Sequence, residues 1–222
     1  VSSLPAMGLE RRLEYLLGYP HGCVEQTVSA ALPQLYLSRL IALDDEQRAR
    51  IQSNVEAAIQ RLRRFQLGDG AFAYWPGAAV ADDWGTSYAG HFLLEARRQG
   101  FAVPAGMLED WADYQRRVGR NPGGEPWQWA GQAYRLYTLA LAGEPEVGAQ
   151  NRLREALSAR ADGDSRQPGY QAARWLLAAA YQQMGLNDVA GELIADADAP
   201  SNYDRPGPTY GSALRDQAIE LL

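Results

Sequence analysis

The sequence predicts an all-α fold in which helical hairpins close into an α/α toroid, with an inner and an outer ring of helices. Apolar residues recur at helical spacing along most of the chain, and no segment shows a convincing strand alternation. The connections between the predicted helices are alternately short and long, as in a series of helix pairs. Strongly apolar helices also alternate with charged ones, which separates buried helices from the amphipathic helices that cover them. An open solenoid of helix pairs is the alternative architecture.

The N-terminal part of the chain predicts three helices, which carry apolar residues at helical intervals. These positions are Leu9, Leu13, Leu16 and Leu17 in the first helix, Val24, Val28, Ala31, Leu32 and Leu35 in the second, and Ile51, Val55, Ile59, Leu62 and Phe65 in the third. Pro33 lies inside the second of these helices. Because proline removes a backbone donor and its ring clashes with the preceding turn, we expect that helix to kink or split there.

The rest of the chain continues as helices joined by loops of alternating length. The predicted helices cover residues 84–99, 105–118, 128–142, 146–160, 169–184, 187–197 and 210–222. The short connections lie near 43–46, 100–104, 143–145 and 185–186, and the long Gly- and Pro-rich loops at 67–83, 120–127, 161–168 and 198–209. Similar short segments, which begin at residues 85, 131, 170 and 210, each open an apolar helix. Their intervals of about 40 residues are typical of a helical-pair repeat.

The alternation of helices also predicts where the long loops meet. In a toroid, the junctions that precede inner helices lie on one face, and each long loop precedes an inner helix. The helix that begins near Cys23 falls in the inner set, so we expect the long loops to gather around this residue. Their aromatic residues, which could screen a reactive group from water, are Tyr74, Trp75, Trp84, Trp127, Trp129, Tyr203 and Tyr210.

Composition and charge exclude several classes of function. The chain has 222 residues, of which 46% are hydrophobic and 22% charged, and this suits one sizeable globular domain. We expect this domain, residues 1–222, to be a fragment of a larger multidomain protein. The net charge is −6 and the basic residues are scattered, so nucleic acid is not an expected partner. One Cys and two His predict neither an internal disulfide nor a metal centre, and no cofactor is expected.

The segment Gly22-Cys23-Val24-Glu25-Gln26 contains the only cysteine of the chain. The thiolate of Cys23 can attack the side-chain amide carbon of Gln26, release ammonia and close a small thioester ring. An outside amine or hydroxyl can then open the ring, which leaves the attacker bonded to Gln26 and frees Cys23. Gly22 permits the backbone angles of a tight turn, and a helix N-terminus stabilises a thiolate. Glu25 is expected to orient the ring or to hold backbone amides.

This motif closely resembles the thioester motif of the alpha-2-macroglobulin and complement superfamily, and the longer stretch Tyr19-Pro-His-Gly-Cys-Val-Glu-Gln-Thr27 is similar to the bacterial alpha-2-macroglobulins. The resemblance covers residues 1–100 best. It implies the α/α-toroid, thioester-containing domain of a large protease-trapping protein, with the thioester between Cys23 and Gln26. Such a protein is an endopeptidase inhibitor that reacts once, so no enzyme is implied. Cleavage of a bait segment would expose the thioester, which would then capture lysine amines of the target protease.

The resemblance also implies a place in the cell. The parent protein would be a periplasmic lipoprotein of bacterial defence, anchored to the inner membrane, whose other domains shield the thioester. No apolar run in this chain reaches membrane-span length, and its first residues do not read as a signal peptide. We therefore expect any export signal or lipid anchor to lie outside residues 1–222.

Histidine usage departs from the complement-like members of the superfamily. In those proteins a downstream His attacks the thioester and steers it toward hydroxyl groups, but no His lies beyond His91 here. The loop where that residue would be expected reads Pro122-Gly-Gly-Glu-Pro-Trp127. His91 itself lies inside a predicted inner helix, where we expect a packed, neutral imidazole. The sequence therefore predicts direct attack by amines.

Two other functions fit parts of the sequence. Gln66-Leu-Gly-Asp-Gly-Ala-Phe72 resembles a turn of terpene cyclases and prenyltransferase β-subunits, which share the toroid. Together with Asp82-Asp83 as an acidic pair, it would suit a terpenoid cyclase-like or carbohydrate-active enzyme. The simpler interpretations are an inter-hairpin turn at Asp69-Gly70 and a helix N-cap at Asp82-Asp83. The second alternative is a structural helical-repeat module with a dead thioester, in which Cys23 is an ordinary buried thiol.

Overall fold

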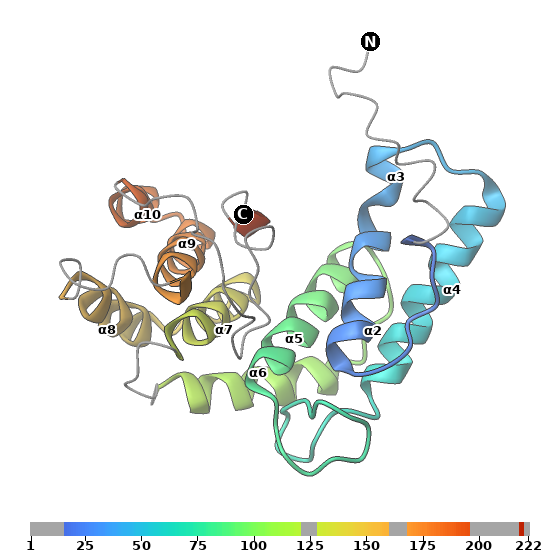
Figure 1. The fold of residues 1–222 in the computed structure, drawn as a ribbon, viewed down its shortest axis with the longest axis horizontal. Helices are drawn as coiled ribbons and strands as arrows, with labels where there is room; N and C mark the ends of the chain where they lie inside the picture. Colours follow the sequence, from blue (N-terminus) through green and yellow to red (C-terminus); the bar gives the residue numbers. More distant parts are fainter. Residues whose placement is uncertain (1–15, 121–127, 160–167, 196–217, 220–222) are drawn as a thin grey trace. The chain divides into compact units, whose positions relative to one another are not determined.

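The computed structural model describes residues 16–120, 128–159, 168–195 and 218–219 (Figure 1). The chain divides into two compact units, Val1–Asp110 and Trp111–Leu222. Within the described residues the secondary structure is helical, and extended pairing is limited to two isolated bridges, Gln66 with Phe72 and Ala73 with Ala81. The Gly22–Gln26 motif belongs to the first unit.

The first unit is built from helices that follow the predicted order. It contains α2 (Val24–Ala31), the 3₁₀ segment η1 (Pro33–Tyr36), α3 (Leu37–Leu40), α4 (Asp45–Leu62), α5 (Asp83–Arg98) and the start of α6 (Ala105–Gly119). The expected break at Pro33 is confirmed, because this residue opens η1 at the first position, where a missing N–H removes no helical hydrogen bond. The helix predicted around Leu9–Leu17 lies almost entirely outside the described residues.

The two longest helices of this unit begin at side-chain caps. At α4, Asp44 accepts a hydrogen bond from the Gln47 backbone N–H at 2.8 Å, and the Gln47 side chain accepts one from the Asp44 N–H at 3.0 Å. At α5, the Asp82 carboxylate accepts from the Gly85 N–H at 2.6 Å. The N-cap interpretation of Asp82-Asp83 is therefore confirmed.

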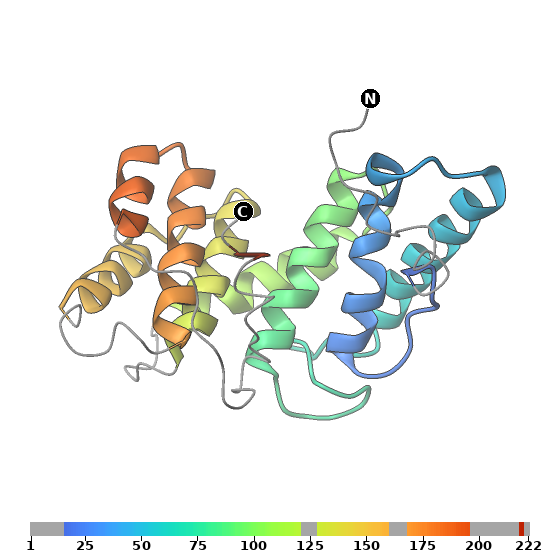
Figure 2. The same ribbon diagram turned by 45° about the horizontal axis from the view of Figure 1, so that its top comes forward.

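Helix α2 lies between α4 and α5, as two views of the fold show (Figures 1 and 2). Its buried face consists of Val24, Thr27, Val28 and Ala31. The first turn of α5 approaches it so closely that a Cβ on Gly85 would lie 2.6 Å from Cγ1 of Val24. The Asn54 side chain on α4 donates a hydrogen bond to the Leu17 carbonyl at 3.0 Å, which ties the segment entering α2 to α4. Both neighbours therefore fix the start of α2.

The long loop between α4 and α5 reaches the N-terminal end of α2. Its turn at Asp69-Gly70 is confirmed, because Gly70 has φ +94° and the Asp69 carboxylate accepts from the Ala71 N–H at 3.2 Å. Beyond the turn, the Tyr74 carbonyl accepts a hydrogen bond from the Val24 N–H at 3.1 Å. The expectation that loop 67–83 lies near Cys23 is therefore confirmed. The other long loops expected there, 120–127, 161–168 and 198–209, lie outside the described residues except at their edges.

The second unit repeats the contrast between buried and amphipathic helices. It contains α7 (Trp129–Leu141), α8 (Val147–Ser158), α9 (Pro168–Gln183) and α10 (Asn187–Ile194). Helix α7 is buried along nearly all of its length and packs extensively against α9. Helix α8 buries only one face, and its other residues are accessible to solvent. The predicted alternation of buried and charged helices is thus confirmed here, whereas the helix predicted over 210–222 lies largely outside the described residues.

Candidate functional site

Cys23 and Gln26 form a reciprocal capping box at the N-terminus of α2. The sulfur of Cys23, the N-cap residue, accepts a hydrogen bond from the Gln26 backbone N–H at 3.5 Å. In return, Oε1 of Gln26 accepts one from the Cys23 backbone N–H at 3.1 Å. A capping box folds the N3 side chain back over the N-cap residue. Each of the two side chains is therefore held against the backbone of the other residue.

The two partners differ in their access to solvent. Cys23 is buried, with 1% of its surface exposed, whereas the side chain of Gln26 is exposed. Gln26 lines a cavity of about 690 Å³, whose wall consists of Leu16, Gly18, Tyr19, His21, Gly22, Glu25, Gln26, Ser29 and Ala30. An acyl group on Gln26 would thus face open space while the sulfur stays on the protein side. The geometry provides the route from outside that a thioester trap requires.

Gly22 is the residue that the folded-back glutamine requires. It has φ +87°, in the left-handed region that favours glycine. A Cβ at this position would lie 1.9 Å from Oε1 and 2.9 Å from Cδ of Gln26. Any side chain would therefore displace the carboxamide from its place over Cys23. The supporting role expected for Gly22 has both a conformational and a steric basis.

Two residues from outside the motif hold it in place; the sequence assigned Arg61 no role and predicted Tyr74 only as a nearby ring. Nη2 of Arg61, on α4, donates to the Gly22 carbonyl at 2.7 Å, and Nε donates to Oγ1 of Thr27 at 3.3 Å. The Tyr74 carbonyl accepts from the Val24 N–H. These partners are far from the motif in sequence, and no local spacing signals them. The spacing Cys-x-x-Gln is itself that of a capping box, and so signals contact between the two residues.

Glu25 bonds along its own helix. Its carboxylate accepts a hydrogen bond from the Ser29 hydroxyl, one turn further along α2, at 2.8 Å. The Ser29 hydroxyl also lies 3.2 Å from the hydroxyl of Tyr88 on α5. Burial raises the pKa of Tyr88, and the nearby Glu25 carboxylate raises it further. Glu25 is thereby held beside Gln26 on the wall of the same cavity, where its negative charge is available to a cation.

Aromatic rings lie around the mouth of this site. Tyr19 is 52% exposed, and its ring packs on the ring of His21 with 4.5 Å between centroids. In the loop that contacts Val24, Trp75 is 53% exposed and lies edge-on to Tyr74 at 5.4 Å.

His91 belongs to a separate polar cluster on α5. Burial lowers its pKa to about 4, although the nearby Glu95 carboxylate acts in the opposite direction. Glu95 accepts hydrogen bonds from the Tyr36 hydroxyl and from Arg98, the latter at 3.0 Å. Burial and the bond to Glu95 raise the pKa of Tyr36 to about 12. His91 is therefore neutral at pH 7, as expected, although the residue is half-buried rather than fully packed in the core.

The low pKa of His91 predicts an acid-sensitive fold. In the unfolded chain the imidazole titrates near 6.5, so between pH 6.5 and 4 the unfolded state binds more protons than the folded state. Stability is then fully present above pH 6.5 and falls with pH through this window, by about 2–3 kcal/mol for this group. Urea unfolding followed by circular dichroism at pH 7.5 and pH 4.5 measures the loss. A His91→Gln variant, which cannot titrate, should lose less stability on acidification; an identical loss would contradict the assignment.

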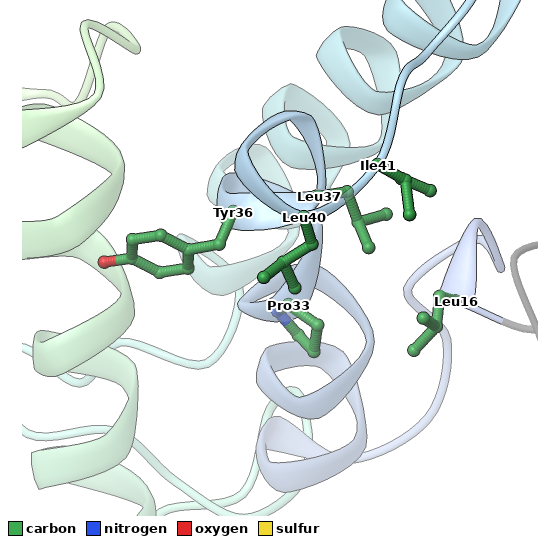
Figure 3. Close-up of a pocket in the computed structure, with 6 residues that line it drawn as sticks. All are labelled: Leu16, Pro33, Tyr36, Leu37, Leu40 and Ile41. Atoms are coloured by element: carbon green, nitrogen blue, oxygen red, sulfur yellow. The ribbon is translucent and has the colours of Figure 1, made fainter. Parts of the chain in front are cut away.

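A second, smaller pocket of about 150 Å³ lies beside η1. Its walls are formed by Leu16, Pro33, Tyr36, Leu37, Leu40 and Ile41, and the Tyr36 ring points away from Leu16 toward α5 (Figure 3). The hydroxyl of Tyr36 is bonded to Glu95, so the pocket presents apolar side chains without a free polar group. Among the described residues, no group of three or more His, Cys, Asp or Glu could hold a metal ion. No helix in the described ranges is long and apolar enough to cross a bilayer.

The fold and the Cys-Gln capping box together define a thioester-containing domain, and comparison with known sequences supports this class. A sequence model of the A-macroglobulin TED domain matches residues 2–114, which is just over half of the chain. The chain belongs to this family. It is 33% identical to the alpha-2-macroglobulin of Escherichia coli K12 over 240 residues, an alignment that covers 100% of this chain but only 14% of the relative.

Solved structures agree with this assignment. The Salmonella alpha-2-macroglobulin reacted with methylamine superimposes with a TM-score of 0.78 at 28% identity, covering 99% of this chain and 15% of that one. The trypsin-activated Escherichia coli alpha-2-macroglobulin gives a TM-score of 0.72 at 30% identity, and the match covers 92% of this chain and 14% of that one. The expected fold class, the all-α toroid of these thioester-containing domains, is thereby confirmed. The chain spans about one seventh of the length of these relatives.

Proposed function

We propose that Cys23 and Gln26 form an internal thioester, and that this chain is the reactive domain of a bacterial alpha-2-macroglobulin that traps proteases covalently. The observation that carries the proposal is the reciprocal capping box, which places a buried sulfur beside an exposed carboxamide. The parent protein would act once per molecule, as an inhibitor. Residues 1–222 would form one domain of that larger protein.

Ring closure begins when the Cys23 thiolate attacks Cδ of Gln26. The sulfur lies at the N-terminus of α2, where the Gln26 backbone N–H donates a hydrogen bond to it. Negative charge then develops on Oε1, which already accepts a hydrogen bond from the Cys23 N–H. When the intermediate collapses, a proton is added to the amide nitrogen, the C–N bond breaks and ammonia leaves. The product is a thioester whose carbonyl keeps the same donor.

Ring opening uses the same atoms in reverse. The unprotonated amine of a lysine attacks Cδ, the C–S bond breaks, and the sulfur leaves as a thiolate at the helix N-terminus. Glu25 faces the same cavity and would attract the lysine ammonium and accept the proton that the attacking nitrogen loses. The product is an amide bond between Gln26 and the lysine, together with a free Cys23. With Glu25 as the proton acceptor, attack by an amine does not require a downstream histidine.

The relatives support the choice of attacker and target. One solved relative is described as reacted with methylamine and another as activated by trypsin, so an amine and a protease both act on proteins of this family. By extension, we propose proteases as the targets of this protein and lysine amines as the bonded groups. We also propose that other domains of the parent protein shield the thioester. The parent protein would lie in the periplasm, held at the inner membrane by a lipid anchor.

Intact mass spectrometry of the full-length protein tests for the thioester. A closed ring lowers the mass by one ammonia and leaves Cys23 unreactive toward a thiol label. Addition of methylamine should replace the sulfur on Gln26 and make Cys23 fully labelled. Glycerol at the same concentration should give far less adduct, because the chain has no histidine downstream of His91 that could transfer the acyl group to hydroxyls. Equal adduct yields from glycerol and methylamine would contradict direct amine attack, and an unmodified mass with a labelled thiol in the native protein would contradict the thioester itself.

A further inference from the structure

We propose that Arg61 is a positioning residue, which acts on the thioester through the peptide unit between Gly22 and Cys23. The inference rests on the proposed function and adds a residue that the motif does not contain. Arg61 lies on α4, and its Nη2 is 2.7 Å from the carbonyl oxygen of Gly22, which is 39 positions earlier in the sequence. A guanidinium donor makes this a charge-assisted hydrogen bond, which is shorter and stronger than a neutral one.

One peptide plane joins this contact to the reacting carbonyl. The C=O of Gly22 and the N–H of Cys23 belong to the same planar unit, and in a trans peptide they point in opposite directions. Arg61 holds the C=O, and the N–H donates to Oε1 of Gln26 at 3.1 Å. Fixing the carbonyl therefore also fixes the direction of the donor. The guanidinium polarises the same unit, and hydrogen bonds in such a chain strengthen one another.

This peptide would otherwise be free to turn. Gly22 has φ +87° and no side chain, so its own sequence places little restriction on the orientation of the following plane. Arg61 is restrained in turn: Nε bonds to Thr27 Oγ1 at 3.3 Å, and the guanidinium lies 5.5 Å from the centre of the Phe65 ring. The rigid fork of arginine reaches Gly22 and Thr27 together, which the single ammonium of lysine cannot reproduce.

The expected consequence is kinetic. In both ring closure and ring opening, negative charge develops on Oε1 of Gln26, and a donor aimed at that atom lowers the barrier. Loss of a directly placed donor of this kind costs about 100- to 1000-fold in rate. Arg61 only orients the donor, so a smaller loss, of about tenfold, is expected when its side chain is removed.

The test uses full-length Arg61→Met, Arg61→Lys and, as matched control, Arg63→Met. Arg63 follows α4 directly, and its guanidinium bonds to Gln60 at 3.2 Å rather than to the motif. The measurements are the fraction of Cys23 that is free to react with a thiol label, the methylamine opening rate of molecules that contain the ring, and the melting temperature. We expect about tenfold slower opening and more free thiol in Arg61→Met, a partial effect in Arg61→Lys, and wild-type values in Arg63→Met.

Two results would overturn the inference. Opening of Arg61→Met at the wild-type rate would do so, as would a lower melting temperature with an unchanged opening rate, because the residue would then be only structural. If Arg61→Met does not fold, the Arg61→Lys variant provides the test. Slower ring opening in Arg61→Lys supports the positioning role, and a wild-type opening rate excludes that role. A wild-type protein without any ring would contradict the proposed function instead, so the two failures are distinct.

Discussion

Replacement of Cys23 by alanine is expected to abolish covalent capture entirely. Without the sulfur no thioester can close, and the Gln26 carboxamide alone is unreactive toward amines. Incubation of the full-length variant with trypsin, followed by denaturing electrophoresis, should show no high-mass adduct, and methylamine should not be incorporated. The fold should persist, because the lost Cys23 hydrogen bond is a cap contribution of about 1 kcal/mol.

A Cys23→Ser variant separates the chemistry from the capping. Serine retains an N-cap acceptor for the Gln26 N–H and so should recover the lost stability. It should remain as inactive as Cys23→Ala in capture, because a hydroxyl does not form the reactive thioester. Adduct at the wild-type level in either variant would show that capture does not depend on a Cys23–Gln26 ring. The structural-repeat alternative with a dead thioester predicts instead that the wild type is also inactive.

The Gly22→Ala substitution is expected to prevent ring formation while leaving the sulfur in place. An added Cβ would lie 1.9 Å from Oε1 of Gln26, so the carboxamide must leave the position over Cys23. The positive φ of 87° adds a backbone cost of about 1–2 kcal/mol for a residue with a Cβ. The intact mass of the full-length variant should show that it retains the ammonia that ring closure releases.

Gly77→Ala is the matched control for this substitution. Gly77 has a similar positive φ of 79°, but nothing lies within 4 Å of the position that its Cβ would take. The control therefore carries the same backbone strain without the clash against Gln26. We expect Gly77→Ala to lose comparable stability and to keep its ring. If both variants formed the ring equally well, the steric account of Gly22 would be wrong.

Much of the site could be predicted because its reacting groups are neighbours in sequence. Cys23 and Gln26 lie within one helical turn, so the position of the helix start almost determines their geometry. The sequence also predicted the special backbone at Gly22 and the break at Pro33, since both follow from the residue's own covalent structure. The Cys-x-x-Gln spacing is also that of a capping box.

Other parts of the site could not be predicted in this way. Helical periodicity did not show that the Glu25 carboxylate bonds to Ser29, whose hydroxyl lies near that of Tyr88 on α5. Tyr74 was expected nearby only as an aromatic ring, but it also contributes its carbonyl to the start of α2. Each contact depends on how one element packs on another, and helical periodicity carries no information about such pairings.

The sequence by itself predicted the reaction and its two residues, because a thiol and a carboxamide three residues apart at a helix start are brought together by local backbone geometry. It also determined the helices, through the spacing of apolar residues. Only the tertiary structure decided that the sulfur is buried and the carboxamide exposed, and that Arg61 holds the peptide between Gly22 and Cys23. Burial and long-range hydrogen bonds arise when α4, α5 and loop 67–83 pack around α2, and contacts between residues distant in the chain leave no local pattern.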